Sequence, residues 1–346
     1  MRQIARIGLD IAKRWFQIHA VDGNDREVLN RKLARDKLLG FLASLPPCDV
    51  ALEACSSSHH WGREIGKLGH RVRLISPNYV KPYVKRGKSD AHDARAICEA
   101  ASRPDMRFVP VKTEDQQAAL MQHTSRQLLI AQRTAVANSL RGQLAEFGVI
   151  EKKGIENVGE LVRMLDDKDA ALVNVPPVAI MVMKVLADQL KAVDEHLAMI
   201  DAQIEAWRQD SAAAQALKTI PGIGALISAA LAAHVADPSV FRSGRDFAAW
   251  MGLVPRQNSS GGKERLGRIT KQGNPYLRRL LVLGATASLR WLQKRTDPLA
   301  DWTRNLLLRR PARLVTVALA NKMARIAWAI MMTGELFRSE ARTATA

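Results

Sequence analysis

Four carboxylates stand where apolar stretches of the sequence end, or where a helix is expected to begin. Asp10 ends Ile-Gly-Leu-Asp, Glu53 ends Val-Ala-Leu-Glu, and Asp90 and Asp93 lie together in Ser-Asp-Ala-His-Asp. Carboxylate oxygens are ligands for divalent cations such as Mg²⁺. Two such ions about 4 Å apart can activate a nucleophile and stabilise the charge on a phosphate. The four side chains therefore predict a two-metal site for phosphoryl transfer.

Each of these carboxylates also has an ordinary structural explanation. Asp10 could begin a turn, and Glu53 could cap the helix that follows it. The pair Ser89 and Asp90 is typical of a helix N-terminus, where Asp93 would favour the helix dipole. The metal site is nevertheless the favoured interpretation. The acids lie at the ends of apolar runs, the order of the predicted strands and helices fits such a site, and a basic segment lies next to them in the sequence.

The charge of the chain indicates a polyanionic partner. The 346 residues carry a net charge of +18, from 52 basic and 34 acidic side chains. A field of that size favours nucleic acid or an anionic membrane. We expect no membrane partner, because no apolar run reaches membrane-spanning length: the stretch 314–320 is too short and polar residues follow it. The N-terminus lacks the apolar core of a signal peptide, and the three cysteines have neither disulfide nor zinc spacing, so we expect a reduced, cytoplasmic protein.

The first 112 residues predict an α/β domain. We expect strands at 4–9, 15–21, 27–32, 49–53 and 71–75, helices at 35–44, 56–69 and from Ser89 onward, and a basic loop at 77–88. Three strands, helix, strand, helix, strand is the order of an RNase H-like (RuvC-like) domain. In the basic loop, Lys85, Arg86 and Lys88 could hold a phosphate next to the metals, or the loop is simply solvated.

Two long amphipathic helices are predicted in the middle of the chain, at 113–146 and 178–211. Their apolar residues recur with coiled-coil-like spacings of three and four. The region 113–211 is therefore either a dimerising arm or an intramolecular hairpin. After it the composition shifts toward Gly, Pro and Arg, which indicates a separate, mainly helical C-terminal domain at 212–340.

Two segments of this C-terminal region have the composition of nucleic-acid contacts. Thr219-Ile-Pro-Gly-Ile-Gly224 looks like the turn of a helix-hairpin-helix motif, in which Gly222 and Gly224 bring backbone N–H groups close to a phosphate. The alternative is ordinary packing of two helices joined by a turn. The segment 252–279 is rich in glycine and in cations that suit a phosphate backbone: Arg256, Lys263, Arg265, Arg268, Lys271 and Arg278.

The basic segment also contains Ser259 and Ser260. A serine in such a field can attack a phosphorus atom if a metal or a base activates it. On composition alone, a flexible basic loop that only binds is the favoured interpretation.

The motifs of both halves, in this order and spacing, resemble the DEDD transposases of bacterial insertion sequences, in the insertion-sequence 110 family (1111 subgroup), which is related to the Piv DNA invertases. The matching N-terminal segments are Ile-Gly-Leu-Asp10, Leu-Glu53-Ala-Cys and Lys-Ser-Asp90-Ala-His-Asp93-Ala. The matching C-terminal segments are Pro-Gly-Ile-Gly224, Gly-Leu-Val-Pro255, Ser260-Gly-Gly-Lys and Lys-Gln-Gly-Asn274. The resemblance spans nearly the whole chain.

The resemblance implies an RNA-guided DNA recombinase that acts on the nucleoid in the bacterial cytoplasm. The four acids would bind Mg²⁺, with two ions, in a RuvC-like site. A serine would form a covalent phosphoester with DNA, and strand exchange would join a donor and a target that a noncoding bridge RNA brings together. The family serine precedes glycine, which matches Ser260, while the adjacent Ser259 stays open. The family combines domains of different subunits in one active site, so a homo-oligomer, a dimer or a tetramer, is implied.

Two other functions remain open. A RuvC-like, structure-selective nuclease would use the same acids with water as the nucleophile. A non-catalytic nucleic-acid-binding protein would need only the basic surface.

Overall fold

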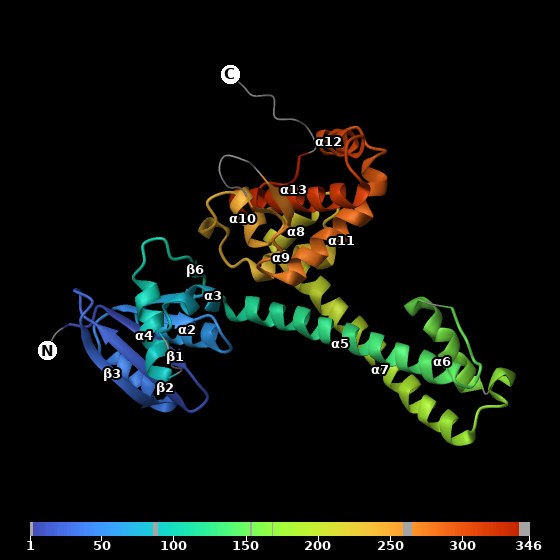
Figure 1. Ribbon diagram of the computed structural model, residues 1–346, viewed down its shortest axis with the longest axis horizontal. Coiled ribbons are helices and arrows are strands. Elements are labelled where there is room, and N and C mark those ends of the chain that lie inside the picture. The colour runs from blue at the N-terminus through green and yellow to red at the C-terminus, as the bar shows by residue number, and fades with distance from the viewer. Residues whose placement is uncertain (1–2, 86–88, 153, 168, 259–264, 339–346) are drawn as a thin grey trace. The chain divides into compact units, whose positions relative to one another are not determined.

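The computed structural model describes residues 3–85, 89–152, 154–167, 169–258 and 265–338. The chain divides into two compact units (Figure 1). The first comprises residues 1–117 together with 235–242, and the second comprises residues 118–234 and 243–346.

The first unit is built on a six-stranded mixed sheet, which confirms the predicted α/β class. The strand order is β3-β2-β1-β4-β5-β6. The strands are β1 (Arg6–Ile11), β2 (Trp15–Val21), β3 (Glu27–Ala34), β4 (Asp49–Glu53), β5 (Arg71–Ile75) and β6 (Phe108–Val109). The first three strands are antiparallel neighbours, whereas β1, β4 and β5 run parallel. The central position of β1 between β2 and β4 is the arrangement expected of an RNase H-like sheet.

Helices cover both faces of this sheet. Helices α1 (Leu38–Ala43) and α2 (Ser58–Lys67) lie on one face, and α4 (Asp90–Ala101) lies on the other. The core under α1 and α2 is formed by large apolar side chains, including Ile7, Leu9, Phe16, Ile18, Leu52, Leu74, Trp61 and Ile65. Under α4 the core is made of smaller residues, including Ala51, Ala96 and Ala100. Small side chains allow α4 to lie close to the strands.

The segment 77–88, which was expected to be a basic loop, begins with helical turns. Helix α3 spans Pro77–Val80, and a 3₁₀ turn follows at Lys81–Tyr83. Pro77 occupies the first helical position, where its missing N–H costs nothing, and Val80 is buried. The loop prediction is therefore wrong for residues 77–83. Lys85 is exposed, while Arg86 and Lys88 lie outside the described residues.

Gly8 fixes the distance between α4 and the sheet. A Cβ atom at this position of β1 would lie 2.2 Å from the carbonyl oxygen of Ala94 and 2.6 Å from the amide nitrogen of Cys98, both in the α4 backbone. Arg6, two residues earlier on the same face, donates from Nε to the carbonyl oxygen of Cys98 at 3.0 Å. Helix α4 can therefore approach β1 only because residue 8 has no side chain.

Gly8→Ala should displace α4 and lower the free energy of unfolding by about 1–3 kcal/mol, the usual cost of overpacking a core. Urea denaturation of the purified protein measures this change. Gly40→Ala is the matched control, because Gly40 lies in α1 with no atom within 4 Å of its added Cβ, and it should be neutral or stabilising. An unchanged midpoint for Gly8→Ala would show that α4 does not pack as described.

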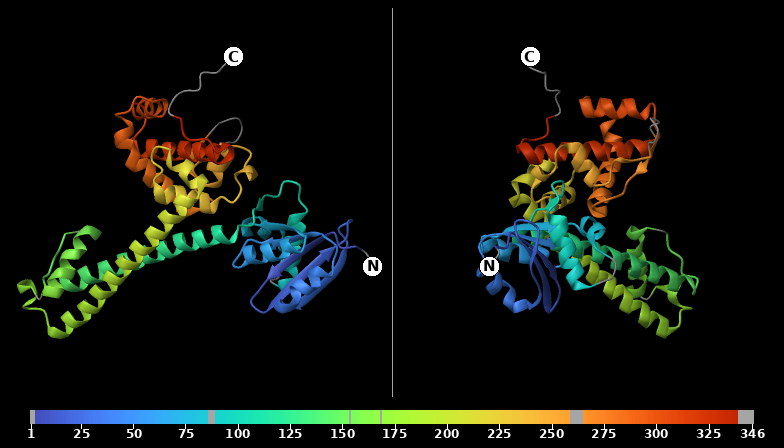
Figure 2. Two further views of the ribbon diagram at one scale, coloured as in Figure 1. Left: turned by 180° about the vertical axis from the view of Figure 1, so that it is seen from behind. Right: turned by 60° about the vertical axis from the view of Figure 1, so that its left-hand side comes forward.

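The second unit begins with a pair of long helices joined through a shorter one. They are α5 (Glu114–Ala145), α6 (Val158–Asp167) and α7 (Pro177–Asp210). Figure 2 shows α5 and α7 side by side in both views. Their shared core includes Leu140 and Leu144 from α5, Leu165 from α6 and Leu190 from α7. The two long helices thus form a hairpin within one chain, and a dimerising role for them stays a prediction.

The remaining helices form a bundle: α8 (Ala212–Lys218), α9 (Ala225–His234), α10 (Gly244–Trp250), α11 (Pro275–Leu292), α12 (Pro298–Leu307) and α13 (Ala312–Thr333). Several begin at a side chain that accepts hydrogen bonds from the first turn, as Ser243 does for α10, Asn274 for α11 and Asp297 for α12. Between α10 and α11 lies a two-stranded antiparallel hairpin of β7 (Pro255–Gln257) and β8 (Leu266–Ile269).

Helix α13 corrects the expectation that no stretch of the chain reaches membrane-spanning length. Within the described part of the chain, it is the one helix whose length and hydropathy would suffice to cross a membrane. It also packs against α10 and α11, with Val315, Leu319 and Met323 fully buried. The central helix of a bundle needs this same apolar character.

Candidate active site

Asp10 and Glu53 are neighbours at one end of the parallel strands β1 and β4. The register pairs Leu9 with Leu52, so the next residue of each strand, Asp10 and Glu53, lies beside its counterpart. Leu9 and Leu52 point into the core under α1 and α2, and side chains alternate along a strand. Both carboxylates therefore lie on the opposite face, the one covered by α4.

Helix α4 places Asp90 and Asp93 in its first turn, on the same face of the sheet. Asp93 directly precedes Ala94, whose carbonyl lies against Gly8, two residues before Asp10 in β1. The close approach permitted by Gly8 thus brings the start of α4 to the strand that carries Asp10.

The ordinary explanations fail for Asp10 and Glu53, whereas the capping explanation holds at α4, where Asp90 and Asp93 lie in the first turn. Ser89 is the N-cap of α4, because its Oγ accepts from the amide of His92 at 3.3 Å. Asp10 pairs with Gln17 inside the β1–β2 ladder, so it does not begin a turn. Helix α2 starts at Ser58 with Ser57 as its N-cap residue, so Glu53 does not cap it.

The four carboxylates lie within electrostatic range of one another. Burial, followed in order of importance by the charges of Asp93, Asp90 and Glu53, raises the pKa of Asp10 to about 6. Burial also raises the pKa of Glu53, and Asp93 adds to that shift. A carboxylate whose pKa is raised by its neighbours lacks a compensating positive charge. A bound cation would supply that charge.

The four carboxylates are not gathered closely enough to share one metal ion. Among residues that the structure describes, no three His, Cys, Asp or Glu side chains are grouped closely enough to hold a metal ion. Asp90 is instead 3.6 Å from the Nζ atom of Lys32 on β3, and both side chains are more than half exposed. Sequence reasoning missed Lys32, because only the β2–β3 pairing brings this strand toward α4. Mutual repulsion of like charges is a physical reason for the open arrangement.

The described residues before and after the two serines pack closely against each other. Ser259, Ser260 and Lys263 lie outside the described residues, between β7 and β8 in the sequence. A Cβ on Gly252 would lie 2.3 Å from the carbonyl oxygen of Gln272, and one on Gly273 would lie 1.7 Å from that of Trp250. Both glycines also have a φ of +70°. The backbones around residues 252 and 273 can therefore pack this closely only because both positions are glycine.

Cations of the basic segment fall into two groups. Arg278 donates from Nη1 to the carbonyl oxygens of Met251 (3.0 Å) and Gln272 (2.7 Å), so it joins the described residues before and after the two serines. The described cations on the hairpin and just after it are exposed: Arg256, Arg265, Arg268 and Lys271. Arg278 was predicted to contact phosphate; its Nη1 atom is bonded within the protein, and the phosphate contact stays a prediction.

The turn between α8 and α9 contains the two glycines predicted to bind nucleic acid. Gly222, with a φ of +88°, packs against α11, because a Cβ there would lie 3.0 Å from the carbonyl oxygen of Gly284. Gly224 has open space around its Cβ position. Gly222 therefore serves the packing of the turn against α11, and Gly224 does not contribute to that packing.

A buried polar pair links two distant parts of the second unit. The hydroxyl of Tyr276, at the start of α11, lies 3.0 Å from Nδ1 of His123 on α5, and the ring of His234 on α9 is adjacent. Burial raises the pKa of Tyr276 to about 12. Burial, with the nearby charges of His234 and Arg126, lowers the pKa of His123 to about 4. No sequence pattern indicates this pair, because 153 positions separate its members.

The lowered pKa of His123 predicts acid sensitivity. The folded protein holds a neutral imidazole, whereas the unfolded chain binds a proton below about pH 6.5. The contribution of His123 is therefore fully present above about pH 6.5 and is lost as the pH falls toward 4, by about 3 kcal/mol. Denaturation at a series of pH values should show a flatter slope for His123→Gln than for the wild type. Identical slopes would contradict the buried neutral state.

Family models of transposases match segments in both halves of the chain. A family model described as "Transposase" matches residues 7–148, and one described as "Transposase IS116/IS110/IS902 family" matches residues 214–299. A probable family 20 transposase of Pseudomonas aeruginosa is 47% identical over 97% of this chain and 99% of that protein. The transposase for insertion sequence element IS1328 of Yersinia enterocolitica is 39% identical over 97% of this chain and 99% of its own. That for IS1111A of Coxiella burnetii is 38% identical over 98% and 92%.

Proposed function

This chain belongs to the IS116/IS110/IS902 family of DEDD transposases, and we propose that it is an RNA-guided recombinase that cuts and rejoins DNA through a covalent serine–DNA intermediate. The observation that carries the proposal is the placement of Asp10 and Glu53 side by side on the sheet face where α4 presents Asp90 and Asp93, with the pKa values of Asp10 and Glu53 raised by burial and by neighbouring acids. In this proposal the protein moves the insertion sequence that encodes it, and it acts in the bacterial cytoplasm.

The family implies dependence on a divalent metal, and the donor set suits Mg²⁺. Four carboxylates, one of them with a pKa near 6 in the absence of a cation, form a hard, negatively charged oxygen site. We assign Asp10, Glu53, Asp90 and Asp93 as its ligands. When bound, the ions supply positive charge that polarises the scissile phosphate. Lys32 neutralises part of the charge of Asp90 and would move aside for a cation.

Ser260 is the proposed nucleophile, with Ser259 as the alternative. Its hydroxyl oxygen forms a bond to phosphorus as a P–O bond of the DNA backbone breaks, and the leaving oxygen takes a proton. The phosphoester conserves the bond energy, so a hydroxyl of the partner strand can reverse the step without ATP. The close contacts of Gly252 and Gly273, together with Arg278, join the described residues before and after the segment that contains the serines.

Exposed cations support the proposed DNA and RNA partners, and an exposed apolar stripe supports a homo-oligomer. Arg256, Arg265, Arg268 and Lys271 suit the backbone of DNA or of a bridge RNA, as does the net charge of +18. A homo-oligomer is supported by four apolar side chains of α7 that are each more than 40% exposed and recur at helical spacing: Val178, Met181, Val182 and Val185. Delegating sequence choice to RNA pairing is consistent with a protein surface that contacts backbone.

Recombination between a donor and a target plasmid tests the proposal. The protein expressed with the noncoding DNA that flanks its gene should give joined products, and RNA should co-purify with it. Deleting the flanking noncoding segment should abolish joining while leaving the level of folded protein unchanged. Joining that persists without this segment, or after nuclease treatment that removes all RNA, would contradict the RNA-guided mechanism.

A further inference from the structure

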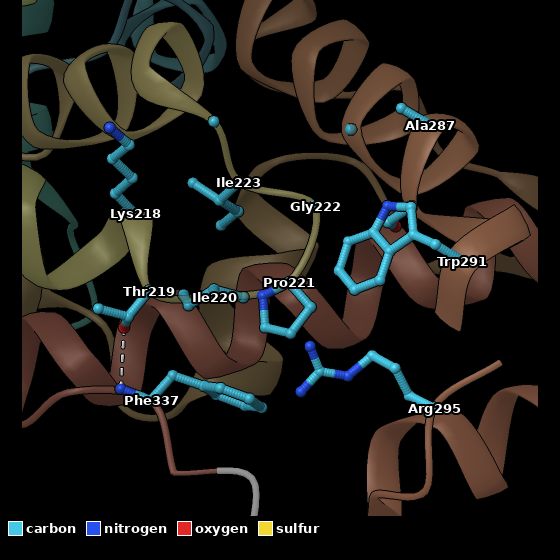
Figure 3. Close-up of a pocket in the computed structure, with 13 residues that line it drawn as sticks. Lys218, Thr219, Ile220, Pro221, Gly222, Ile223, Ala287, Trp291, Arg295 and Phe337 are labelled. Carbon is cyan, nitrogen blue, oxygen red and sulfur yellow. Dashed lines mark hydrogen bonds between the residues drawn. The ribbon is translucent and has the colours of Figure 1, made fainter. Parts of the chain in front are cut away.

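A cavity of about 590 Å³ lies in the second unit, between the 219–224 turn and helix α11 (Figure 3). Its volume is within the range of small-molecule binding sites. Among the described residues that line it are Trp291 and Ser288 of α11, Arg295 after that helix, and Phe337 near the chain's end. None of the residues proposed for catalysis is among them.

Two aromatic rings border this cavity. Figure 3 shows the indole of Trp291 beside Pro221, and the ring of Phe337 across from it, with Arg295 reaching between them. Trp291 is 40% exposed. The position of Phe337 is fixed, because its backbone N–H donates to Thr219 Oγ1 at 2.9 Å. Two aromatic rings around an open volume favour a flat, aromatic ligand.

The charged side chains that line the cavity favour an anionic ligand. Lys218 and Arg295 are cationic, and none of the described lining residues is acidic. The guanidinium of Arg295 lies 5.6 Å from the centre of the Trp291 ring, and its Nε donates to Asp297 Oδ2 at 2.6 Å. Asp297 is itself held by the amides of Leu299 and Ala300. The side chain of Arg295 is thus oriented in advance and still 43% exposed, with terminal N–H groups left for a ligand.

We propose that this cavity binds an unpaired nucleotide, with the base stacked on Trp291 and the phosphate paired with Arg295. A base inside a duplex has both faces covered by its neighbours, so only an unpaired base can use the indole. The proposal rests on the proposed function, in which strand exchange and RNA guidance expose single strands. DNA and RNA strands offer the same chemistry here.

Fluorescence anisotropy with a short single strand, made as DNA and as RNA of the same sequence, tests the pocket in the full chain. Trp291→Ala should weaken binding by about 5-fold or more, because base–aromatic stacking is worth about 1–3 kcal/mol per base. Trp291→Phe should restore most of the affinity. Trp15→Ala is the matched control, because Trp15 is 50% exposed on β2, and it should bind as the wild type does.

A strand that carries abasic sites keeps every phosphate and so separates stacking from charge. Wild type and Trp291→Ala should bind this strand equally. A loss confined to the DNA strand or to the RNA strand supports the pocket and identifies its ligand. Equal binding of the intact strands by wild type and Trp291→Ala, or the same loss for the abasic strand, would overturn the proposal.

Photocrosslinking covers the case in which Trp291→Ala does not fold. A bromouracil-containing strand irradiated with the wild-type protein should give an adduct on Trp291 or Phe337, located by mass spectrometry. Adducts found only elsewhere would contradict the pocket. These experiments require no recombination. Strand binding that depends on Trp291, in a protein that forms no serine–DNA product, would support the pocket and contradict the proposed function.

Discussion

Ser260→Ala should abolish the covalent protein–DNA product, lowering its yield by at least about 10³-fold, because it removes the hydroxyl oxygen proposed to attack phosphorus. The product is a protein band of raised mass on a denaturing gel, formed with a labelled donor DNA and Mg²⁺. Binding of RNA and the free energy of unfolding should stay at wild-type values, because the change removes one oxygen atom. Ser260→Cys is a second variant of similar size that keeps a nucleophilic atom.

Ser259→Ala is the matched control, one residue away in the same loop. It should retain the adduct if Ser260 is the nucleophile, and the outcomes reverse if Ser259 is. A Ser260→Ala protein that cuts DNA as the wild type does, without an adduct in either protein, would instead favour the RuvC-like nuclease with water as its nucleophile. Those two results separate the recombinase from its main rival.

Asp10→Asn should reduce joining of donor and target DNA by about 10³-fold, the effect of losing roughly 4 kcal/mol of metal-dependent stabilisation. The pKa of Asp10 is raised first by burial and then by the charges of all three other acids, Asp93, Asp90 and Glu53. The amide keeps the shape of the side chain and removes the repulsion. Thermal unfolding of the metal-free variant should therefore occur at or above the wild-type temperature at neutral pH.

Asp36→Asn serves as the control, because Asp36 is an exposed acid of the same unit whose recorded ion pair is with Lys37. It should recombine DNA normally. A metal-free Asp10→Asn protein that is less stable than the wild type would show that Asp10 is structural. Loss of joining would then say nothing about metal binding.

The sequence was sufficient to predict the elements that carry the acids. Strand β2 and strand β4 coincide with the predicted ranges 15–21 and 49–53, because alternating or continuous apolar residues specify a strand between turn residues. Strand β6 was missed, since its two residues are too few to show a period. Helix α3 was missed because the whole segment 77–88 was interpreted as a basic loop.

The arrangement of side chains within the sites was less predictable. That Asp10 and Glu53 lie side by side follows from the β1–β4 register, and the approach of α4 depends on Gly8, whose importance shows only in the packing. Arg278 lies in a basic segment and was predicted to bind phosphate. Its Nη1 atom instead donates to the backbone carbonyl oxygens of Met251, 27 positions earlier, and of Gln272. Contacts between residues far apart in the chain leave no local pattern in a single sequence.

Titration of the full-length, metal-free protein with Mn²⁺, followed by calorimetry, is the most direct test of shared metal binding by the four carboxylates. Mn²⁺ prefers the same oxygen ligands as Mg²⁺. The wild-type protein should bind ions at a site that Asp10→Asn and Asp93→Asn each weaken by at least about 10-fold, since each removes a charged ligand. Asp36→Asn should leave the titration unchanged. Equal Mn²⁺ affinity in the wild type, Asp10→Asn and Asp93→Asn would contradict the account.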